Sequence, residues 1–156
     1  MGHRRRGGFT LTELLAVMLI LAIAAALARS GFEGLMAGAR ARAAIREMVT
    51  DFRYAQQMAV SEGKNYYVLI DWENNFYRIK TSSHPQPKVI KQVWLEGNVR
   101  LTGIKSNDNN FYSRKEFHFC SSGAPSSGIT IYLQDYRGKD YSITVLPATG
   151  RVRVYY

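Results

Sequence analysis

The sequence predicts an α+β fold in which one long N-terminal helix packs on antiparallel β-sheet. Three observations support this. An almost unbroken apolar run extends from Leu14 to Ala28, apolar residues then recur at helical spacing as far as Ala59, and after Gly63 short alternating segments are separated by turn residues. A chain of 156 residues can bury one modest core besides such a helix.

The first element is a short basic leader, residues 1–8, which contains three arginines and ends in Gly7 and Gly8. A secretory signal normally places its small-residue cleavage site after the apolar core, whereas these glycines precede it. They leave the backbone open to a peptidase, and the arginines hold this end in the cytoplasm. The apolar helix is therefore expected to stay with the mature protein.

Residues 9–30 are expected to form a single membrane-spanning helix. The segment from Phe9 to Leu27 extends about 28 Å at about 1.5 Å per residue, close to the hydrocarbon thickness of about 30 Å. The rest of the chain would then lie outside the cytoplasm. Glu13 lies inside this apolar segment, where a charge costs roughly 2.5 to 3.5 kcal/mol at mid-bilayer, so it needs a partner or a function. The alternative is an interfacial acid hydrated among lipid headgroups.

Residues 31–63 are expected to continue the helix in amphipathic form and to end it at Gly63. The apolar stripe that should lie on the sheet consists of Leu35, Ala39, Ile45, Met48, Val49, Phe52, Ala55 and Ala59. The charged residues, expected on solvated faces, are Arg40, Arg42, Arg46, Glu47, Asp51 and Arg53.

Residues 64–156 are expected to form an extracytoplasmic β domain of antiparallel hairpins. The predicted strands are Tyr66 to Asp71, Phe76 to Thr81, Lys88 to Trp94, Val99 to Ile104, Glu116 to Phe119, Ile129 to Gln134, Tyr141 to Leu146, and Arg151 to Tyr155. Tight turns are predicted at 73–75 and 137–139, and looser loops at 82–87 and 105–110.

Charge and cysteine content restrict the partners and the source of stability. The chain has 21 Lys and Arg against 12 Asp and Glu, and removal of the leader leaves a net charge of +6. A basic domain favours anionic partners such as DNA, surface polymers or lipid headgroups. Cys120 is the single cysteine, so no internal disulfide can form and the domain must rely on its hydrophobic core.

The leader ending in Gly8, followed by Phe9-Thr10-Leu11-Thr12-Glu13-Leu14-Leu15, resembles the class III signal of type IV pilins and type II secretion pseudopilins. The resemblance implies that a prepilin peptidase cleaves between Gly8 and Phe9 and that the new Phe9 amine is methylated. It also implies that the helix serves first as a membrane anchor and then packs against other pilin subunits. In that setting Glu13 would pair with the Phe9 amine of a neighbouring subunit, since a buried charge requires an opposite one.

The predicted order of leader, long helix and antiparallel strands resembles that of the GspH/FimT family of minor pilins and pseudopilins. The C-terminal segments that carry this resemblance are 119–123, 129–131, 141–145 and 150–154, each a strand or a glycine turn. The family implies a pilin-like fold, insertion in the cytoplasmic membrane with the C-terminal domain outside, and later incorporation into a pilus or pseudopilus.

Gly150-Arg151-Val152-Arg153 resembles the Gly-Arg-x-Arg motif that is implicated in DNA binding during natural transformation in the FimT-like branch. In a strand, residues two apart share a face about 6.6 Å apart, so Arg151 and Arg153 would reach successive phosphates after a turn permitted by Gly150. The alternative is that these arginines form the solvated face of an edge strand.

Neighbouring residues extend the possible DNA surface. Arg137 and Lys139 occupy a predicted hairpin tip and would widen the basic region, and Tyr155 and Tyr156 would stack on unpaired bases.

No enzymatic activity, cofactor or metal is expected. Glu116, His118 and Cys120 share one strand face, but no second pair of ligands has suitable spacing. A serine elbow, a phosphate loop and paired catalytic carboxylates are also missing from the sequence.

Two functions stay open. The first is a minor pilin or pseudopilin that joins or primes a pilus-like filament and binds DNA for natural transformation. The second is a subunit at the tip of a type II secretion pseudopilus, with a purely structural role and no DNA binding.

Overall fold

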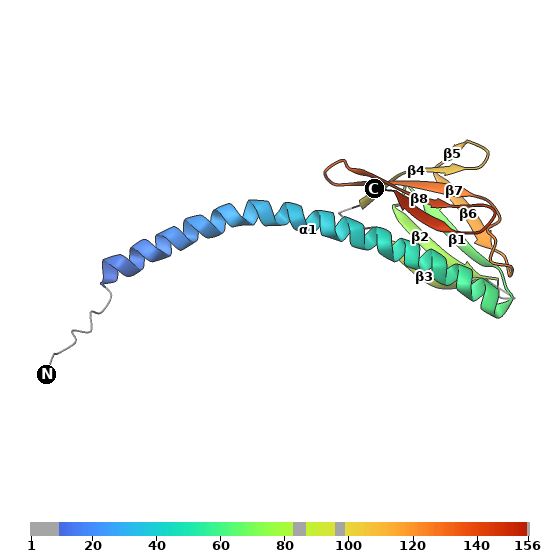
Figure 1. Cartoon of the computed structure of the whole chain (residues 1–156), viewed down its shortest axis with the longest axis horizontal. Coiled ribbons are helices and arrows are strands. Elements are labelled where there is room, and N and C mark those ends of the chain that lie inside the picture. Colours follow the sequence, from blue (N-terminus) through green and yellow to red (C-terminus); the bar gives the residue numbers. More distant parts are fainter. Residues whose placement is uncertain (1–9, 83–86, 96–98, 156) are drawn as a thin grey trace. The chain divides into compact units, whose positions relative to one another are not determined.

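The computed structural model describes residues 10–82, 87–95 and 99–155, apart from the side chains of 28–35 and 37. In these ranges one helix, α1 (Leu11–Glu62), precedes nine β-strands that pair only in antiparallel fashion (Figure 1). The predicted α+β fold is confirmed. The chain divides into two compact units, Met1–Ala37 and Gly38–Tyr156, which we describe separately.

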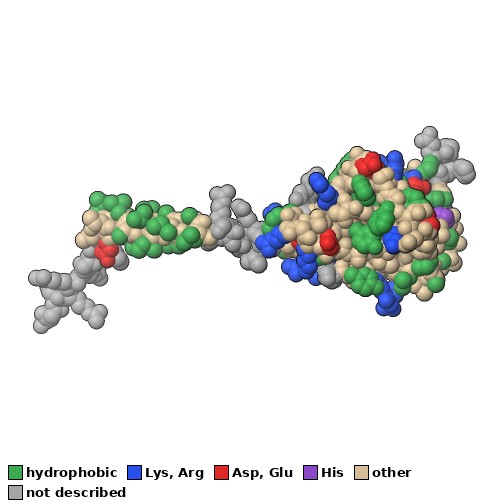
Figure 2. All heavy atoms as spheres, turned by 90° about the horizontal axis from the view of Figure 1, so that it is seen from above, with side chains coloured by type: hydrophobic (Ala, Val, Ile, Leu, Met, Phe, Trp, Pro, Cys, Tyr) green, Lys and Arg blue, Asp and Glu red, His purple; other side chains and the backbone are tan. Residues whose placement is uncertain are grey.

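In the first unit, the start of α1 is fixed by Thr10, which acts as an N-cap. The Glu13 amide donates to the Thr10 hydroxyl oxygen at 3.3 Å and to the Thr10 carbonyl at 3.1 Å, so a free amide of the first turn is satisfied. The apolar side chains that follow are exposed, for example Leu11 at 77% and Leu27 at 72%, and Figure 2 shows them over the visible side of this segment. Within the described ranges, no helix combines the length and hydropathy needed to cross a membrane.

In the second unit, α1 buries one stripe against the sheets. The buried residues of this stripe are Ala41, Ile45, Met48, Val49, Phe52, Ala55 and Ala59. The predicted stripe is therefore confirmed from Ile45 onward, whereas Ala39 is exposed. Ala39 lies about 200° around the helix from Ala41, so only Ala41 continues the stripe. The helix ends at Glu62 because Gly63 adopts a φ of 63°, as predicted.

The strands form two sheets. The 4-stranded sheet has the order β3-β2-β1-β6, and the 5-stranded sheet has the order β5-β4-β7-β8-β9. Their bounds are β1 (Tyr66–Asp71), β2 (Phe76–Thr81), β3 (Lys88–Trp94), β4 (Val99–Ser106), β5 (Phe111–Tyr112), β6 (Arg114–Phe119), β7 (Ile129–Asp135), β8 (Asp140–Val145) and β9 (Val152–Tyr155).

The predicted strands agree with these bounds to within two residues, with two corrections. β5 was missed because two residues are too few to show alternation. β9 begins at Val152, so Arg151 lies in the turn before it and not in the strand. Most of the predicted loop at 82–87 lies outside the described residues.

The core is centred on an aromatic cluster beneath α1. The Phe52 ring meets Tyr77 of β2 edge-on at a centroid distance of 5.9 Å and Phe117 of β6 at 6.0 Å. All three side chains are at most 1% exposed. Burial of each such ring contributes about 1.5–3 kcal/mol, so this cluster holds the 4-stranded sheet on the helix.

Asn75 fastens the two sheets to each other. It lies in the predicted tight turn between β1 and β2 at a φ of 53°, which asparagine tolerates better than most residues. Its side-chain amide donates to the carbonyls of Leu95 and Val99, the latter at 3.1 Å, and its Oδ1 accepts from the Leu101 amide at 2.8 Å. One side chain thus satisfies three backbone groups, one just after β3 and two at the start of β4.

Asp51 was predicted to lie on a solvated face of the helix. That prediction is wrong, because the residue is buried at 8% exposure. Its carboxylate accepts hydrogen bonds from the Tyr77 hydroxyl at 2.6 Å and from Lys91 Nζ at 2.9 Å, and Lys91 also reaches Glu47 at 2.8 Å. Burial and the bond to Asp51 raise the pKa of Tyr77. Burial alone would lower the pKa of Lys91, but its bonds to Asp51 and Glu47 raise it.

Candidate functional site

Gly8 and Phe9, the predicted processing site, lie outside the described residues, and Glu13 is the first of the predicted site residues that the structure describes. Glu13 stands in the first turn of α1 and is exposed. Its carboxylate forms no ion pair with another described residue. An anion at a helix N-terminus is favoured by the helix dipole, and the exposure of this carboxylate leaves it accessible from outside the chain.

The candidate basic motif occupies the turn between β8 and β9. The Gly150 amide donates to the Leu146 carbonyl at 2.9 Å, and the Leu146 amide donates to the Arg151 carbonyl at 3.1 Å. Arg151 is exposed in this turn, and Arg153 is exposed on the edge strand β9 opposite Thr144. Val152, between them, is buried at 5% exposure. Within the described ranges, neither guanidinium forms an ion pair or hydrogen bond.

The glycine of this motif is required by packing against the helix. Gly150 has a φ of 64°, and a Cβ there would lie 2.3 Å from Gln56 Nε2 and 2.7 Å from the Gly123 carbonyl oxygen. Gln56 Nε2 donates to the Gly123 carbonyl at 2.7 Å and to the Thr149 carbonyl at 3.2 Å. Sequence reasoning missed Gln56, since a glutamine in a helix carries no signal of a contact 93 residues away.

Arg137 and Lys139 lie in the turn between β7 and β8 and are held by local contacts. The amides of both residues donate to Asp135 Oδ1, at 2.8 Å and 2.9 Å. The Arg137 guanidinium donates to the Tyr136 hydroxyl at 2.6 Å, and Lys139 Nζ lies 5.4 Å from the centre of the Tyr141 ring. These contacts fix the predicted hairpin tip.

The two pairs of basic residues lie toward opposite ends of β8. This strand begins beside the Arg137 turn at Asp140, and Arg153 pairs with Thr144, which lies about 13 Å further along at about 3.3 Å per residue. Arg151 precedes the strand and lies beyond Val145, still further from the tip. The expectation that Arg137 and Lys139 widen the surface around Arg151 is therefore not supported by the strand register.

Glu116, His118 and Cys120 do not form a metal site. The two residues between them, Phe117 and Phe119, are buried, and the His118 ring lies 5.1 Å from the ring of Tyr67 on the outer face of the sheet. Among the residues that the structure describes, no group of three His, Cys, Asp or Glu side chains is placed to hold a metal ion.

Comparisons with known proteins give the following relatives. Residues 3–28 match the family model described as a prokaryotic N-terminal methylation motif. The chain is 26% identical over 153 residues to type II secretion system protein H of Xanthomonas campestris pv. campestris. The aligned region covers 97% of this chain and 84% of that protein.

Solved structures show the same fold at lower identity. The minor pseudopilin EpsH of the Vibrio cholerae type 2 secretion system matches with a TM-score of 0.61 and 13% identity, covering 74% of this chain and 96% of that one. The type IV minor pilin FimU of Pseudomonas aeruginosa matches with a TM-score of 0.55 and 15% identity, covering 74% and 88%.

The resemblance to type IV minor pilins and type II secretion pseudopilins is confirmed by these matches. The relatives are subunits of secretion systems and pili and none is an enzyme, in agreement with the sequence-based expectation.

Proposed function

We propose that this chain is a minor pseudopilin of a type II secretion system, with the role of protein H. The observation that carries the proposal is the match to protein H over 97% of this chain, which includes the β domain as well as the N-terminal motif. The pilin-like fold supports it, because the second half of α1 and both sheets form one compact unit with its own core.

The N-terminal segment supplies the anchor in this proposal. A prepilin peptidase cleaves between Gly8 and Phe9, the Phe9 amine is methylated, and residues 9–30 cross the inner membrane once with the β domain outside. The methylation motif at residues 3–28 supports this processing. Mass spectrometry of the protein from cell envelopes should find a methylated Phe9 at the N-terminus. Recovery of chains that still begin at Met1 would contradict the processing step.

Assembly depends on Glu13 in this proposal. The Glu13 carboxylate, exposed in the first turn of α1 and without a described ion pair, accepts a hydrogen bond from the methylated amine of Phe9 of the adjacent subunit. Glu13→Ala should still insert in the membrane, because it removes a charge from an apolar helix, but should no longer copurify with the other pseudopilins. Glu73→Ala, which removes an exposed acid from a turn, is the matched control. Normal incorporation of Glu13→Ala would refute the pairing.

DNA binding is a second candidate function. It is favoured by the exposure of Arg151 and Arg153 without a described ion pair and by the net charge of +6 that remains after leader removal. Binding through two phosphate contacts should weaken about tenfold between about 50 and 200 mM salt, and more if other basic residues also contact phosphates. The test is an electrophoretic mobility assay on the full chain.

A charge-matched pair of variants separates specific contacts from general attraction. The double variant Arg151→Ala, Arg153→Ala should weaken DNA binding at least about tenfold if these side chains contact phosphates. The double variant Arg137→Ala, Lys139→Ala removes the same charge near the other end of β8. A DNA-binding site at the motif would be ruled out if both double variants lost the same DNA affinity. It would also be ruled out if Arg151→Ala, Arg153→Ala lost none.

A further inference from the structure

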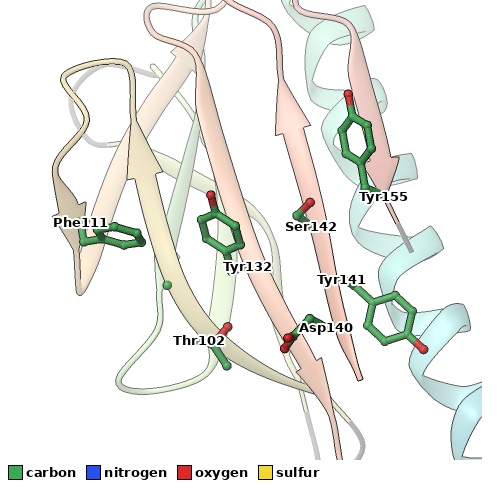
Figure 3. Close-up of a pocket in the computed structure, with 8 residues that line it drawn as sticks. Thr102, Phe111, Tyr132, Asp140, Tyr141, Ser142 and Tyr155 are labelled. Atoms are coloured by element: carbon green, nitrogen blue, oxygen red, sulfur yellow. The ribbon is translucent and has the colours of Figure 1, made fainter. Parts of the chain in front are cut away.

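The outer face of the 5-stranded sheet carries a slot between two tyrosines (Figure 3). Tyr132 of β7 pairs with Ser142 of β8, and Ser142 pairs with Tyr155 of β9, so the three residues form one row across the strands. Tyr141 and Ile143, the neighbours of Ser142 along β8, are buried in the core, which places Ser142 and both tyrosine side chains on the solvent side. The cavity over this row has a volume of about 480 Å³.

A third aromatic side chain extends the slot on the side of β4. The Phe111 ring of β5 lies 6.1 Å from the Tyr132 ring and leans over Gly103, where an added Cβ would lie 3.4 Å from it. Phe111 is 63% exposed and Tyr155 is 52% exposed. Three aromatic side chains thus line one depression, and two of them have more than half of their surface open to solvent; exposed apolar clusters rimmed by polar residues mark interaction sites.

Polar groups occupy the floor and one end of the slot. The Ser142 hydroxyl lies between the two tyrosines, and Thr102 and Asp140 lie beyond them (Figure 3). The Gln134 amide donates to Asp140 Oδ1 at 2.9 Å and so orients the carboxylate. Asp140 Oδ2 has no hydrogen-bond partner among the described residues, which leaves an oriented acceptor at the edge of the cavity.

The width of the slot fits one ring. Strands lie about 4.8 Å apart, so the backbones that carry Tyr132 and Tyr155, two strands from each other, are about 10 Å apart. A ring in contact with both tyrosines needs two carbon contacts of about 3.5–4.0 Å, or about 7–8 Å in total. The spacing of the backbones therefore leaves room for a single ring between the two side chains, above Ser142.

We propose that this slot binds a ring of a saccharide chain, a function beyond that of a pseudopilin subunit. The C–H faces of a sugar ring suit the electron-rich faces of Tyr132 and Tyr155, and its hydroxyl groups donate to Asp140 and exchange hydrogen bonds with Ser142. Nucleic acid fits less well, because its phosphates would approach the Asp140 carboxylate. A wholly apolar partner would leave these polar groups unpaired.

The test is a calorimetric titration of the full chain in a detergent without a sugar headgroup. The probes are oligosaccharides of glucose, xylose, N-acetylglucosamine and galacturonate, which separate neutral from acidic saccharides. At least one should bind, and Tyr132→Ala or Tyr155→Ala should weaken it about tenfold or more, while Tyr155→Phe, which keeps the ring, should retain most of the affinity.

Tyr136→Ala is the matched control, because Tyr136 is an equally exposed tyrosine outside the slot, at 53%. Its affinity for the saccharide should be unchanged. Thermal unfolding of each variant checks that the fold is kept. The proposal is overturned if no probe binds at millimolar concentration, if the slot variants bind as well as Tyr136→Ala, or if single-stranded DNA binds the slot and saccharides do not.

Discussion

Substitution of Gly150 by alanine should destabilise the β domain strongly, although the residue lies in a surface turn. An alanine at a φ of 64° costs about 1–2 kcal/mol of backbone strain. Its Cβ would also lie 2.3 Å from Gln56 Nε2, so the glutamine must move and give up its bonds to the carbonyls of Gly123 and Thr149. Each lost bond costs about 0.5–1.5 kcal/mol, which brings the expected total to about 2–5 kcal/mol.

Gly138→Ala is the control for the backbone contribution. Gly138 has a φ of 79°, and nothing lies within 4 Å of the position where its Cβ would be. Only the strain of about 1–2 kcal/mol should therefore appear in this variant. The measurement is urea unfolding of the full chain in detergent micelles, followed by tryptophan fluorescence. If Gly150→Ala lowers the free energy of unfolding no more than Gly138→Ala does, the contact with Gln56 does not constrain the turn.

Three further predictions concern the core of the domain. Asn75→Ala should cost about 2–4 kcal/mol in urea unfolding because three backbone groups lose their partner, whereas Asn109→Ala, also at positive φ, should cost only about 1 kcal/mol. Asp51→Ala should cost about 1–3 kcal/mol, and double-mutant cycles with Tyr77→Phe and Lys91→Met should show coupling. The folded-state pKa values of Tyr77 and Lys91 are raised above the ordinary values of 10.0 and 10.5, so the unfolded chain loses protons first and stability should fall as pH rises above about 10. Tyr77→Phe should make that fall shallower in unfolding measured across this pH range.

Local signals in the sequence predicted most of the fold. The periods of 3.6 and 2 residues, together with glycines and asparagines at turns, located α1 and the longer strands because each signal depends only on neighbours along the chain. Asp51 shows where such reasoning fails. Nothing near it in sequence indicates that Lys91 and Tyr77, from two different strands, will surround it and make its burial favourable.

The candidate sites divide in the same way. The leader and Glu13 form a continuous motif that can be read directly from the sequence. The slot has no such motif, because Phe111, Tyr132 and Tyr155 come from three strands and meet only through the order of the sheet. The distance between Arg153 and the Arg137 turn likewise depends on strand register, which hydrophobic alternation alone does not specify.

The contact between Gly150 and Gln56 also affects how the Gly-Arg-x-Arg pattern should be used to compare genomes. The glycine is required by the packing of a hairpin on a helix. The two arginines are exposed, so they can vary with the binding partner of the hairpin. Among homologues, the glycine should therefore track the residue at position 56 and vary independently of the two arginines. A search profile that scores the glycine and both arginines together would count a glycine required by packing as evidence for DNA binding. The glycine and the arginine pair should therefore be scored in separate profiles.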